Sequence, residues 1–129
     1  MTNTSATTIS EISLVAVPTT DQDRSIEFYE SLGFEKRTDM ALGDQYRWVE
    51  VHPPNGTTGL ALVPPRTGDP TAVQTGIILT SDDIEATHAE LQSLGVDVDG
   101  EIARMGAPVP PMFWFRDPDA NSLLIVQRS

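Results

Sequence analysis

An acidic and a basic side chain stand two positions apart in a segment that alternates polar or aromatic residues with valine. Residues 47–52 read Arg-Trp-Val-Glu-Val-His. Because successive side chains of a strand point to opposite faces, Trp48, Glu50 and His52 are expected on one face and the valines on the other. A carboxylate and an imidazole on one face can bind a cation, act as an acid–base pair or hold a metal ion. Glu50 and His52 are therefore the candidate catalytic residues, and a solvated His52 at the strand end is the alternative.

A second segment near the C-terminus alternates in the same way. Residues 112–116 read Met-Phe-Trp-Phe-Arg and precede turn residues at 117–121. If this turn pairs Arg116 with Ser122, then Trp114 stands opposite a leucine of the next strand. The residues that would share the face of Trp114 are Met112, Arg116 and Leu124.

Two tryptophans, Trp48 and Trp114, are thus expected to point into one cavity. An aromatic and aliphatic lining suits a planar or amphipathic ligand that binds by stacking, and Glu50 would receive a positive group. The alternative is that both tryptophans fill a collapsed core.

Other chemistry is limited by the residue types present. Cysteine is absent, which excludes disulfides, thiolate nucleophiles and Cys-ligated metal centres. The sequence contains no glycine-rich phosphate loop, nucleophile motif or paired-carboxylate motif. The second histidine, His88, falls among polar residues of a helical segment, where we expect an exposed side chain.

The elements that must carry these residues begin with a strand and a helix. Residues 12–17 are rich in β-formers, and after the cap residues Thr20 and Asp21 the spacing of apolar side chains predicts a helix over residues 23–32. Gly33 ends this helix. Strand-like segments separated by turn residues follow at residues 34–37, 47–51 and 59–63.

The same order of elements returns in the second half, so that the chain contains an internal repeat. Ser81-Asp82 lies 61 residues after Thr20-Asp21, and Gly95 lies 62 residues after Gly33. The second set of elements is predicted at residues 76–80, 84–94 (the helix), 97–98, 112–116 and 123–127. We predict an α+β fold of two βαβββ modules, with curved mixed sheets around a cup and the helices outside. The single domain, residues 10–128, is divided into module 1 (10–64), a linker (65–71) and module 2 (72–128).

Length and charge limit the class of protein. The 129 residues suffice for one domain, and the net charge of −11 repels phosphate backbones and anionic membranes. We therefore expect no nucleic-acid or membrane partner. Residues 1–10 are polar and lack the pattern of a signal peptide, so we expect a frayed leader and a cytoplasmic location.

Several motifs in this order resemble the vicinal oxygen chelate superfamily, which groups glyoxalases, extradiol dioxygenases and bleomycin-resistance-type binding proteins. The resemblance covers about residues 11–128 and is carried by residues 21–29, 32–35, 47–49, 82–84, 94–96 and 115–121. One departure is Ala120, which stands where the turn of the family usually has glycine. We expect Asn121, which tolerates left-handed backbone better, to adopt that conformation.

The resemblance implies a divalent metal held by His, Gln or Glu side chains in the cup, one each from the outer and inner strands of both modules. The matching positions here are Leu14, residues 60–62, Gly76 or its neighbour Thr75, and Leu124. These residues cannot build a chelate, so we expect no metal and no other cofactor.

The most direct interpretation is a metal-free small-molecule-binding protein, which takes an apolar or aromatic compound, cationic ones included, in the cup. The expected ligand-binding residues are Leu14, Ala16, Trp48, Glu50, His52, Met112, Trp114, Arg116 and Leu124. The alternative is a glyoxalase- or dioxygenase-like lyase or isomerase that uses Glu50 and His52 or a relocated divalent metal. The resemblance also favours a homodimer, because half-open sheets of this kind commonly complete their cups through a partner.

Overall fold

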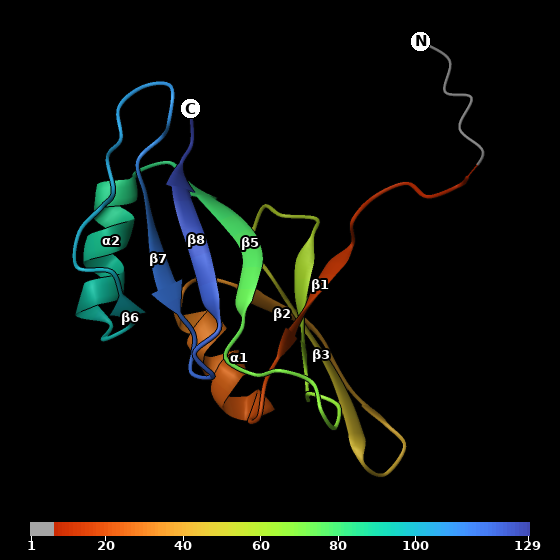
Figure 1. Cartoon of the computed structure of the whole chain (residues 1–129). Helices are drawn as coiled ribbons and strands as arrows, with labels where there is room; N and C mark the ends of the chain where they lie inside the picture. The colour runs from red at the N-terminus through yellow and green to blue at the C-terminus, as the bar shows by residue number, and fades with distance from the viewer. Residues whose placement is uncertain (1–6) are drawn as a thin grey trace.

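A computed structural model describes residues 7–129, which form two helices and eight strands (Figure 1). Module 1 contains β1 (Leu14–Pro18), α1 (Gln22–Ser31), β2 (Glu35–Leu42), β3 (Tyr46–His52) and β4 (Gly59–Val63). Module 2 contains β5 (Gln74–Ser81), α2 (Ile84–Ser93), β6 (Asp97–Val98), β7 (Met112–Arg116) and β8 (Ser122–Gln127). The predicted α+β fold of two βαβββ modules is confirmed. Residues 1–6, which are part of the expected leader, lie outside the described residues.

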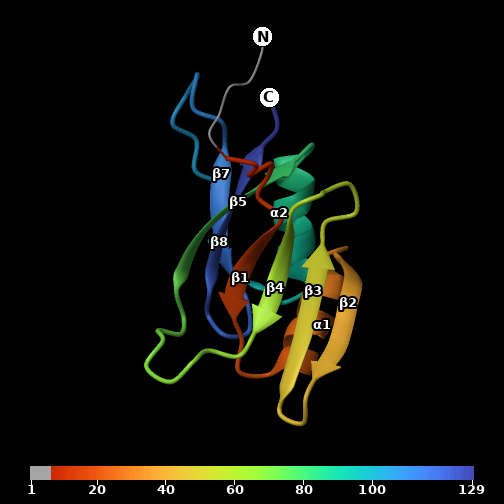
Figure 2. The ribbon, with the colours of Figure 1, turned by 90° about the vertical axis from the view of Figure 1, so that its right-hand side faces the viewer.

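The two sheets have the same topology. Their strand orders are β1-β4-β3-β2 and β5-β8-β7-β6, with β1–β4 and β5–β8 parallel and the other pairs antiparallel. Two views at right angles place the edge strands β1 and β5 next to each other at the middle of the molecule (Figures 1 and 2). The β2–β3 hairpin projects away from the body of the protein.

Each helix begins at an aspartate whose side chain accepts a hydrogen bond from the backbone three residues later. Asp21 accepts from the N–H of Arg24, and Asp83 accepts from the N–H of Ala86. The second cap is therefore Asp83, one residue beyond the expected Ser81-Asp82, because Ser81 still belongs to β5. Both caps and both helix ends are consequently 62 residues apart.

One hydrophobic core joins the two modules. The inward residues of β1 and β3, Val17, Val49 and Val51, lie in the same cluster as Phe113 and Phe115 of β7. Tyr29 and Leu91 add the inward faces of the helices. Because the helix-covered faces of both sheets contribute to this shared core, the opposite faces of the sheets point away from it.

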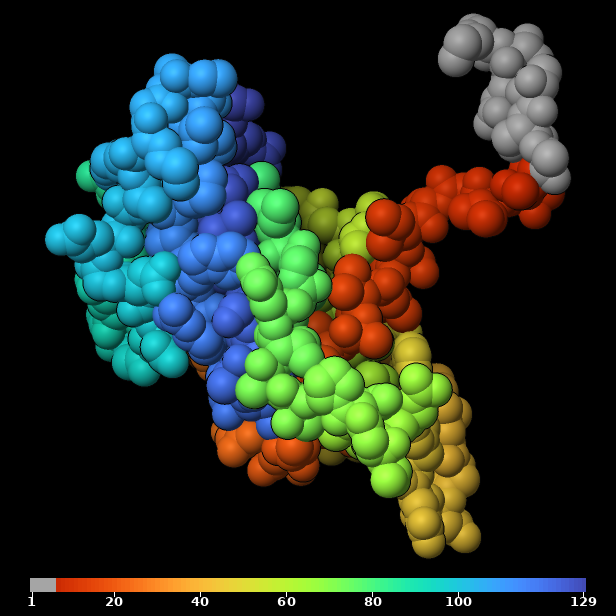
Figure 3. Space-filling model, viewed as in Figure 1, coloured from red at the N-terminus to blue at the C-terminus, as the bar shows by residue number. Residues whose placement is uncertain are grey.

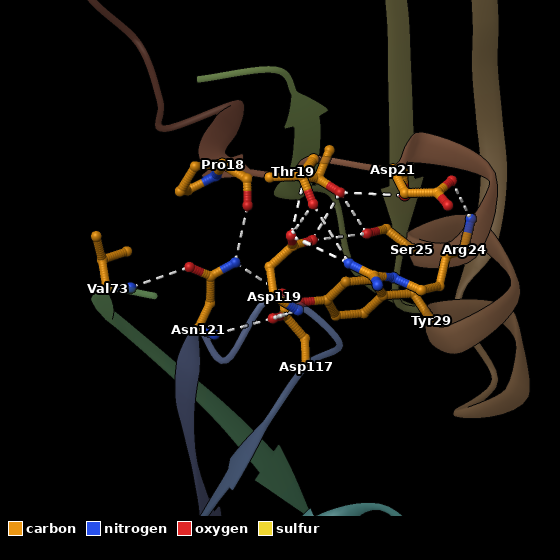
Figure 4. A network of polar contacts seen from close by, with 11 residues as sticks. Pro18, Thr19, Asp21, Arg24, Ser25, Tyr29, Val73, Asp117, Asp119 and Asn121 are labelled. Carbon is orange, nitrogen blue, oxygen red and sulfur yellow. Dashed lines mark hydrogen bonds and ion pairs between the residues drawn. The ribbon is translucent and has the colours of Figure 1, made fainter. Parts of the chain in front are cut away.

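A polar network closes the module junction where α1 meets the β7–β8 turn (Figure 4). The Tyr29 hydroxyl donates to Asp117 at 2.9 Å, and the Asn121 amide donates to the carbonyl of Pro18 at 2.8 Å. Asp119 accepts from the hydroxyl of Thr19 at 2.9 Å. These bonds join residues about 100 positions apart, and they fix module 2 against the start of α1.

Burial and the nearby carboxylates change the acidity of this network. Burial, and then the charge and hydrogen bond of Asp117, raise the pKa of Tyr29 well above its usual range, so its hydroxyl stays protonated. Burial alone would raise the pKa of Asp119, but hydrogen bonds from Thr20 and Thr19 and the nearby Arg24 outweigh it and lower that pKa.

Two local expectations are wrong. His88 is 8% exposed, because α2 turns it inward: its ring lies against Phe113 and its Nε2 is 2.7 Å from the carbonyl oxygen of Asp99. Ala120, not Asn121, has the left-handed backbone, with φ of 62°. Asn121 is fully buried and must hold the junction, so it is not free to adopt the turn conformation.

Candidate functional site

The open face of module 1 is the sheet surface opposite the helix. Val15, Val17, Val49 and Val51 belong to or pack against the core, so the residues between them on the same strands lie on the other side. We call this surface, made of Leu14, Ala16, Trp48, Glu50, His52 and Ala61, the module 1 open face. The structure thus brings five of the expected site residues together on one sheet.

Glu50 is the polar centre of the module 1 open face. The indole Nε1–H of Trp48 donates to Glu50 Oε2 at 2.6 Å, and Nε2 of His52 lies 3.5 Å from Glu50 Oε1. The second distance is at the long limit for a hydrogen bond. Because the carboxylate is half-buried and held on one side by an indole, its orientation on the sheet is fixed.

His52 is 8% exposed, so the alternative of a solvated side chain is wrong. Its ring lies over Gly59 of the neighbouring strand, where an added Cβ would stand only 2.4 to 2.6 Å from three ring atoms. Its Nδ1 atom is buried and has no hydrogen-bond partner among the described residues. A buried imidazole nitrogen without a partner is uncommon in folded proteins, so Nδ1 is an unsatisfied polar atom at this site.

The open face of module 2 carries the second tryptophan. The register pairs Trp114 with Leu124 and Arg116 with Ser122, as the turn predicts. Phe113 and Phe115 lie in the core on the opposite side. The surface formed by Ile78, Met112, Trp114, Arg116 and Leu124 is the module 2 open face.

Arg116 is held by acidic residues that sequence reasoning missed. Its guanidinium lies 2.8 Å from Asp99 and 3.7 Å from Asp97. Asp99 also accepts from the backbone N–H of Trp114 at 3.2 Å. Asp99 follows the two-residue strand β6 and pairs with a distant strand, so no local pattern in the sequence identifies it.

The two open faces are separate within one chain. Within residues 7–129 no hydrogen bond or ion pair joins the Glu50 cluster to Arg116 or Trp114. Since both faces point away from the shared core, the structure does not bring the two tryptophans into one cavity of a single protomer.

The residues at the positions where the resemblance implies metal ligands do not fit a metal ion. The side chains of Leu14, Ala61 and Leu124, and also Gly76, offer no nitrogen or oxygen donor, and the hydroxyl of Thr75 donates to the carbonyl of Ser122 at 2.8 Å. Throughout the described part of the chain, no group of three or more His, Asp and Glu side chains is placed to hold one. His52 and Glu50 provide two donors and lack a third.

Residues 11–125 match the family model described as the Glyoxalase/Bleomycin resistance protein/Dioxygenase superfamily. The chain belongs to this superfamily. Neither helix in the described residues is long and apolar enough to cross a membrane.

Three relatives show how near the chain lies to other members. The uncharacterized protein YetH of Bacillus subtilis is 30% identical over 121 residues, which cover 91% of this chain and 98% of YetH. The crystal structure of TnmS3, an antibiotic binding protein from Streptomyces sp. CB03234, is 36% identical with a TM-score of 0.81, over 95% of this chain and 99% of TnmS3. A superfamily member from Sphaerobacter thermophilus is 31% identical with a TM-score of 0.83, over 93% and 98%.

Proposed function

We propose that this protein binds an apolar or aromatic small molecule, cationic compounds included, without a metal ion. The observation that carries the proposal is the Glu50 carboxylate on the module 1 open face, whose orientation Trp48 fixes. Among the described residues this carboxylate has too few neighbouring donors to chelate a metal ion. The likeness to TnmS3, an antibiotic binding protein, supports a small-molecule ligand.

The ligand would lie between the two open faces, with the expected binding residues of both modules around it. Rings of Trp48 and Trp114 offer stacking surfaces, and Glu50 offers the negative charge for a cationic group. Leu14, Ala16, Met112 and Leu124 would supply apolar contacts, while Arg116, held by Asp99, would offer N–H donors at the opposite end of the site.

A homodimer is part of this proposal. The open faces of one protomer point away from each other, so one chain offers two separate half-sites. A second copy that places its module 2 open face against module 1 would complete a cup with both tryptophans. Exposed apolar residues on or beside these faces, among them Met40, Tyr46 and Ile78, would be covered in the same step.

Two ring-matched probes test the site. N-methylacridinium and acridine have the same ring system, and at pH 8 only the first is charged, so a titration calorimeter separates the charge from the shape of the ligand. Both are expected to bind and to quench tryptophan fluorescence, and the cation should bind more tightly. Trp114→Ala should weaken binding of both by at least about 1 kcal/mol through lost stacking.

Glu50→Gln keeps the volume of the side chain and removes its charge. This variant should abolish the preference for the cation while leaving acridine binding nearly unchanged. Binding that is insensitive to Trp114→Ala, or a cation preference that survives Glu50→Gln, would place the ligand elsewhere. Elemental analysis that finds one tightly held metal ion per chain would overturn the metal-free part of the proposal.

The second candidate is a lyase or isomerase that uses Glu50 and His52. The observation in its favour is the buried Nδ1 atom of His52, which lacks a partner while Nε2 faces a carboxylate. Mass spectrometry of a compound captured from the purified protein tests this function. Conversion of that compound by the native protein and not by His52→Ala would support catalysis, and an unchanged compound would favour binding alone.

A further inference from the structure

A cavity of about 730 Å³ lies on the helix side of the molecule, and of the residues of the two open faces only Ile78 borders it. It is bordered by α2, by β5 and by the loop between β3 and β4, which meet on the right-hand side of Figure 2. Apolar residues of both modules line it, including Val15, Leu60, Ile77, Leu79 and Leu91. Its volume lies in the range of pockets that bind small molecules. In the space-filling view of Figure 3, β5 lies between β8 and β1 on the face toward the viewer.

The internal repeat shows why a hollow exists here. In module 1 the ring of Phe28 packs on Phe115 with ring centroids 6.3 Å apart, and Tyr29 bonds to Asp117 of the β7–β8 turn. These two aromatic side chains fill the space between α1 and module 2. The 62-residue spacing places Glu90 and Leu91 at the equivalent positions of α2, and both line the cavity. The space between α2 and module 1 therefore lacks two aromatic rings.

Each module has a pair of hydrogen-bonded hydroxyl groups at its helix start, but only the pair in module 1 has a carboxylate partner. In module 1 the hydroxyls of Thr19 and Ser25 bond to each other, and Thr19 donates to the Asp119 carboxylate. In module 2 the equivalent hydroxyls of Ser81 and Thr87 bond to each other at 2.7 Å and line the cavity. The β3–β4 loop brings no acidic side chain to them, because its residues 53–58 read Pro-Pro-Asn-Gly-Thr-Thr.

One carboxylate at the cavity is not paired with a cation of the described residues. All eight lysine and arginine side chains of the chain form ion pairs with other carboxylates. Arg128, the cation that lines the cavity, pairs with Asp82 at 2.9 Å. Glu90 takes part in none of these ion pairs of the described residues, so its carboxylate can receive a positive group from a ligand.

We propose that this cavity is a second small-molecule site, which binds a compact aromatic amine. The aromatic ring takes the place that Phe28 occupies in module 1, against Ile77, Leu79 and Leu91. The ammonium group faces Glu90, and a neighbouring polar group of a larger ligand would reach the hydroxyls of Ser81 and Thr87. Apart from Ile78 at its border, the site shares no residue with the open faces, and it contains neither tryptophan.

The test uses the full chain with phenethylamine as the probe and 2-phenylethanol, which has the same chain length, as its neutral counterpart. Methyl NMR follows the Ile77 methyl group, which lies at the cavity, and the Ile102 methyl group, which does not line it. Phenethylamine is expected to shift the Ile77 signal saturably and to leave Ile102 unchanged, and the neutral alcohol should bind at least fivefold more weakly.

Three variants distinguish an amine held in this cavity from one held elsewhere on the protein. Glu90→Phe restores the residue that module 1 has at this position and should abolish the Ile77 shift. Glu90→Gln should bring the affinities of the amine and the alcohol within about twofold of each other. Glu85→Gln, which removes an exposed carboxylate of the same helix outside the cavity, should bind like the native protein.

The proposal is overturned if Ile77 does not respond to the amine, as would happen if a second copy covered the cavity. It is equally overturned if the response persists in Glu90→Phe, or if Glu85→Gln weakens binding as much as Glu90→Gln does. Trp114→Ala should not change the Ile77 response, so a failure of this site and a failure of the open-face site are distinguishable.

Discussion

The contact between His52 and Gly59 shows how one small residue shapes the candidate site. The imidazole lies flat over the glycine of the adjacent strand, in the volume that any other side chain would need. Gly59 is itself buried and its backbone N–H donates to the carbonyl of Ser13, so the strand cannot move aside easily. His52 keeps its position next to Glu50 because of this gap.

Gly59→Ala should therefore displace the His52 ring. The added methyl group would stand within 2.6 Å of three ring atoms, and we expect a loss of about 1 to 3 kcal/mol in the free energy of unfolding, as is usual for overpacking. Denaturant unfolding of the purified variants measures this loss.

His52→Ala provides the matched control for that substitution. In the His52→Ala background the added methyl group meets no ring, so Gly59→Ala should cost less than about 0.5 kcal/mol there. An equal cost in both backgrounds would show that the strain lies in the backbone of β4 and not in the contact with His52.

The sequence predicts which face of the sheet these residues occupy, but it does not predict how deeply they are buried. Alternation in β3 depends on neighbours in the chain, and it placed Trp48, Glu50 and His52 together correctly. Burial of His52 depends on Gly59, which is set opposite by the pairing of two strands, and burial of His88 depends on the carbonyl of Asp99. Such contacts across elements leave no periodic signal.

At the scale of elements, the β7–β8 turn combines a strained residue with a rigid junction. Ala120 has φ of 62°, a conformation that costs an alanine about 1 kcal/mol relative to glycine. The turn retains this conformation because Asp117 binds the backbone N–H of both Asp119 and Asn121.

Ala120→Gly should raise the free energy of unfolding by about 0.5 to 1 kcal/mol, because glycine adopts the left-handed conformation without strain. The same exchange in a helix has the opposite effect, so Ala86→Gly in α2 should lower stability by about 1 kcal/mol. Thermal unfolding measures the stability of both variants. A loss of stability in Ala120→Gly would contradict the strain argument.

The carboxylate of Asp119 links this turn to α1 in a pH-dependent manner. Its pKa is lowered in the folded state, so the ionised group stabilises the fold above the unfolded value of about 3.9, and the contribution is lost as the pH falls below it. Asp119→Asn should cost about 2 kcal/mol at pH 7, and the difference from the native protein should shrink as the pH is lowered from about 4 to 2.

Asp44→Asn is the control for this pH dependence, since Asp44 lies exposed in the β2–β3 turn. Its unfolding free energy should follow that of the native protein at every pH. If the gap between Asp119→Asn and the native protein stays constant between pH 7 and pH 2, the ionised carboxylate is not what stabilises the junction.

Elements were predictable where local signals are strong. Strands β4, β6 and β7 have the predicted bounds, and the two helices differ from the prediction by a single residue at their ends. Strand β2 extends to Leu42, five residues beyond the expected end at residue 37, since this edge strand is exposed on both faces and shows no apolar alternation. Pairing with β3, which the turn at Gly43 and Asp44 permits, defines it instead.

At the scale of the whole molecule, the repeat conserves topology while the two junctions differ. α1 meets module 2 through Phe28, Tyr29 and the Asp119 network, whereas α2 faces module 1 across a cavity. The spacing of the repeat was readable in the sequence because caps and helix ends are local. The difference between the two junctions could not be predicted from the sequence, because it depends on which loop each helix meets.

At the scale of the whole molecule, the two open faces predict a dimer. Light scattering should find about twice the 14.0 kDa mass of one chain. Ile78 is 61% exposed and lies on the module 2 open face, so Ile78→Lys leaves the fold of one protomer intact and places a charge where a second copy would cover it. This variant should shift the mass toward one chain and, because one wall of the cup is lost, should weaken N-methylacridinium binding in parallel.

Leu94→Lys is the control: Leu94 is 53% exposed at the end of α2, on the helix side, and its substitution should leave the dimer unchanged. A native protein with the mass of one chain, or a dimer that Leu94→Lys dissociates and Ile78→Lys does not, would contradict the placement of the interface on the open faces.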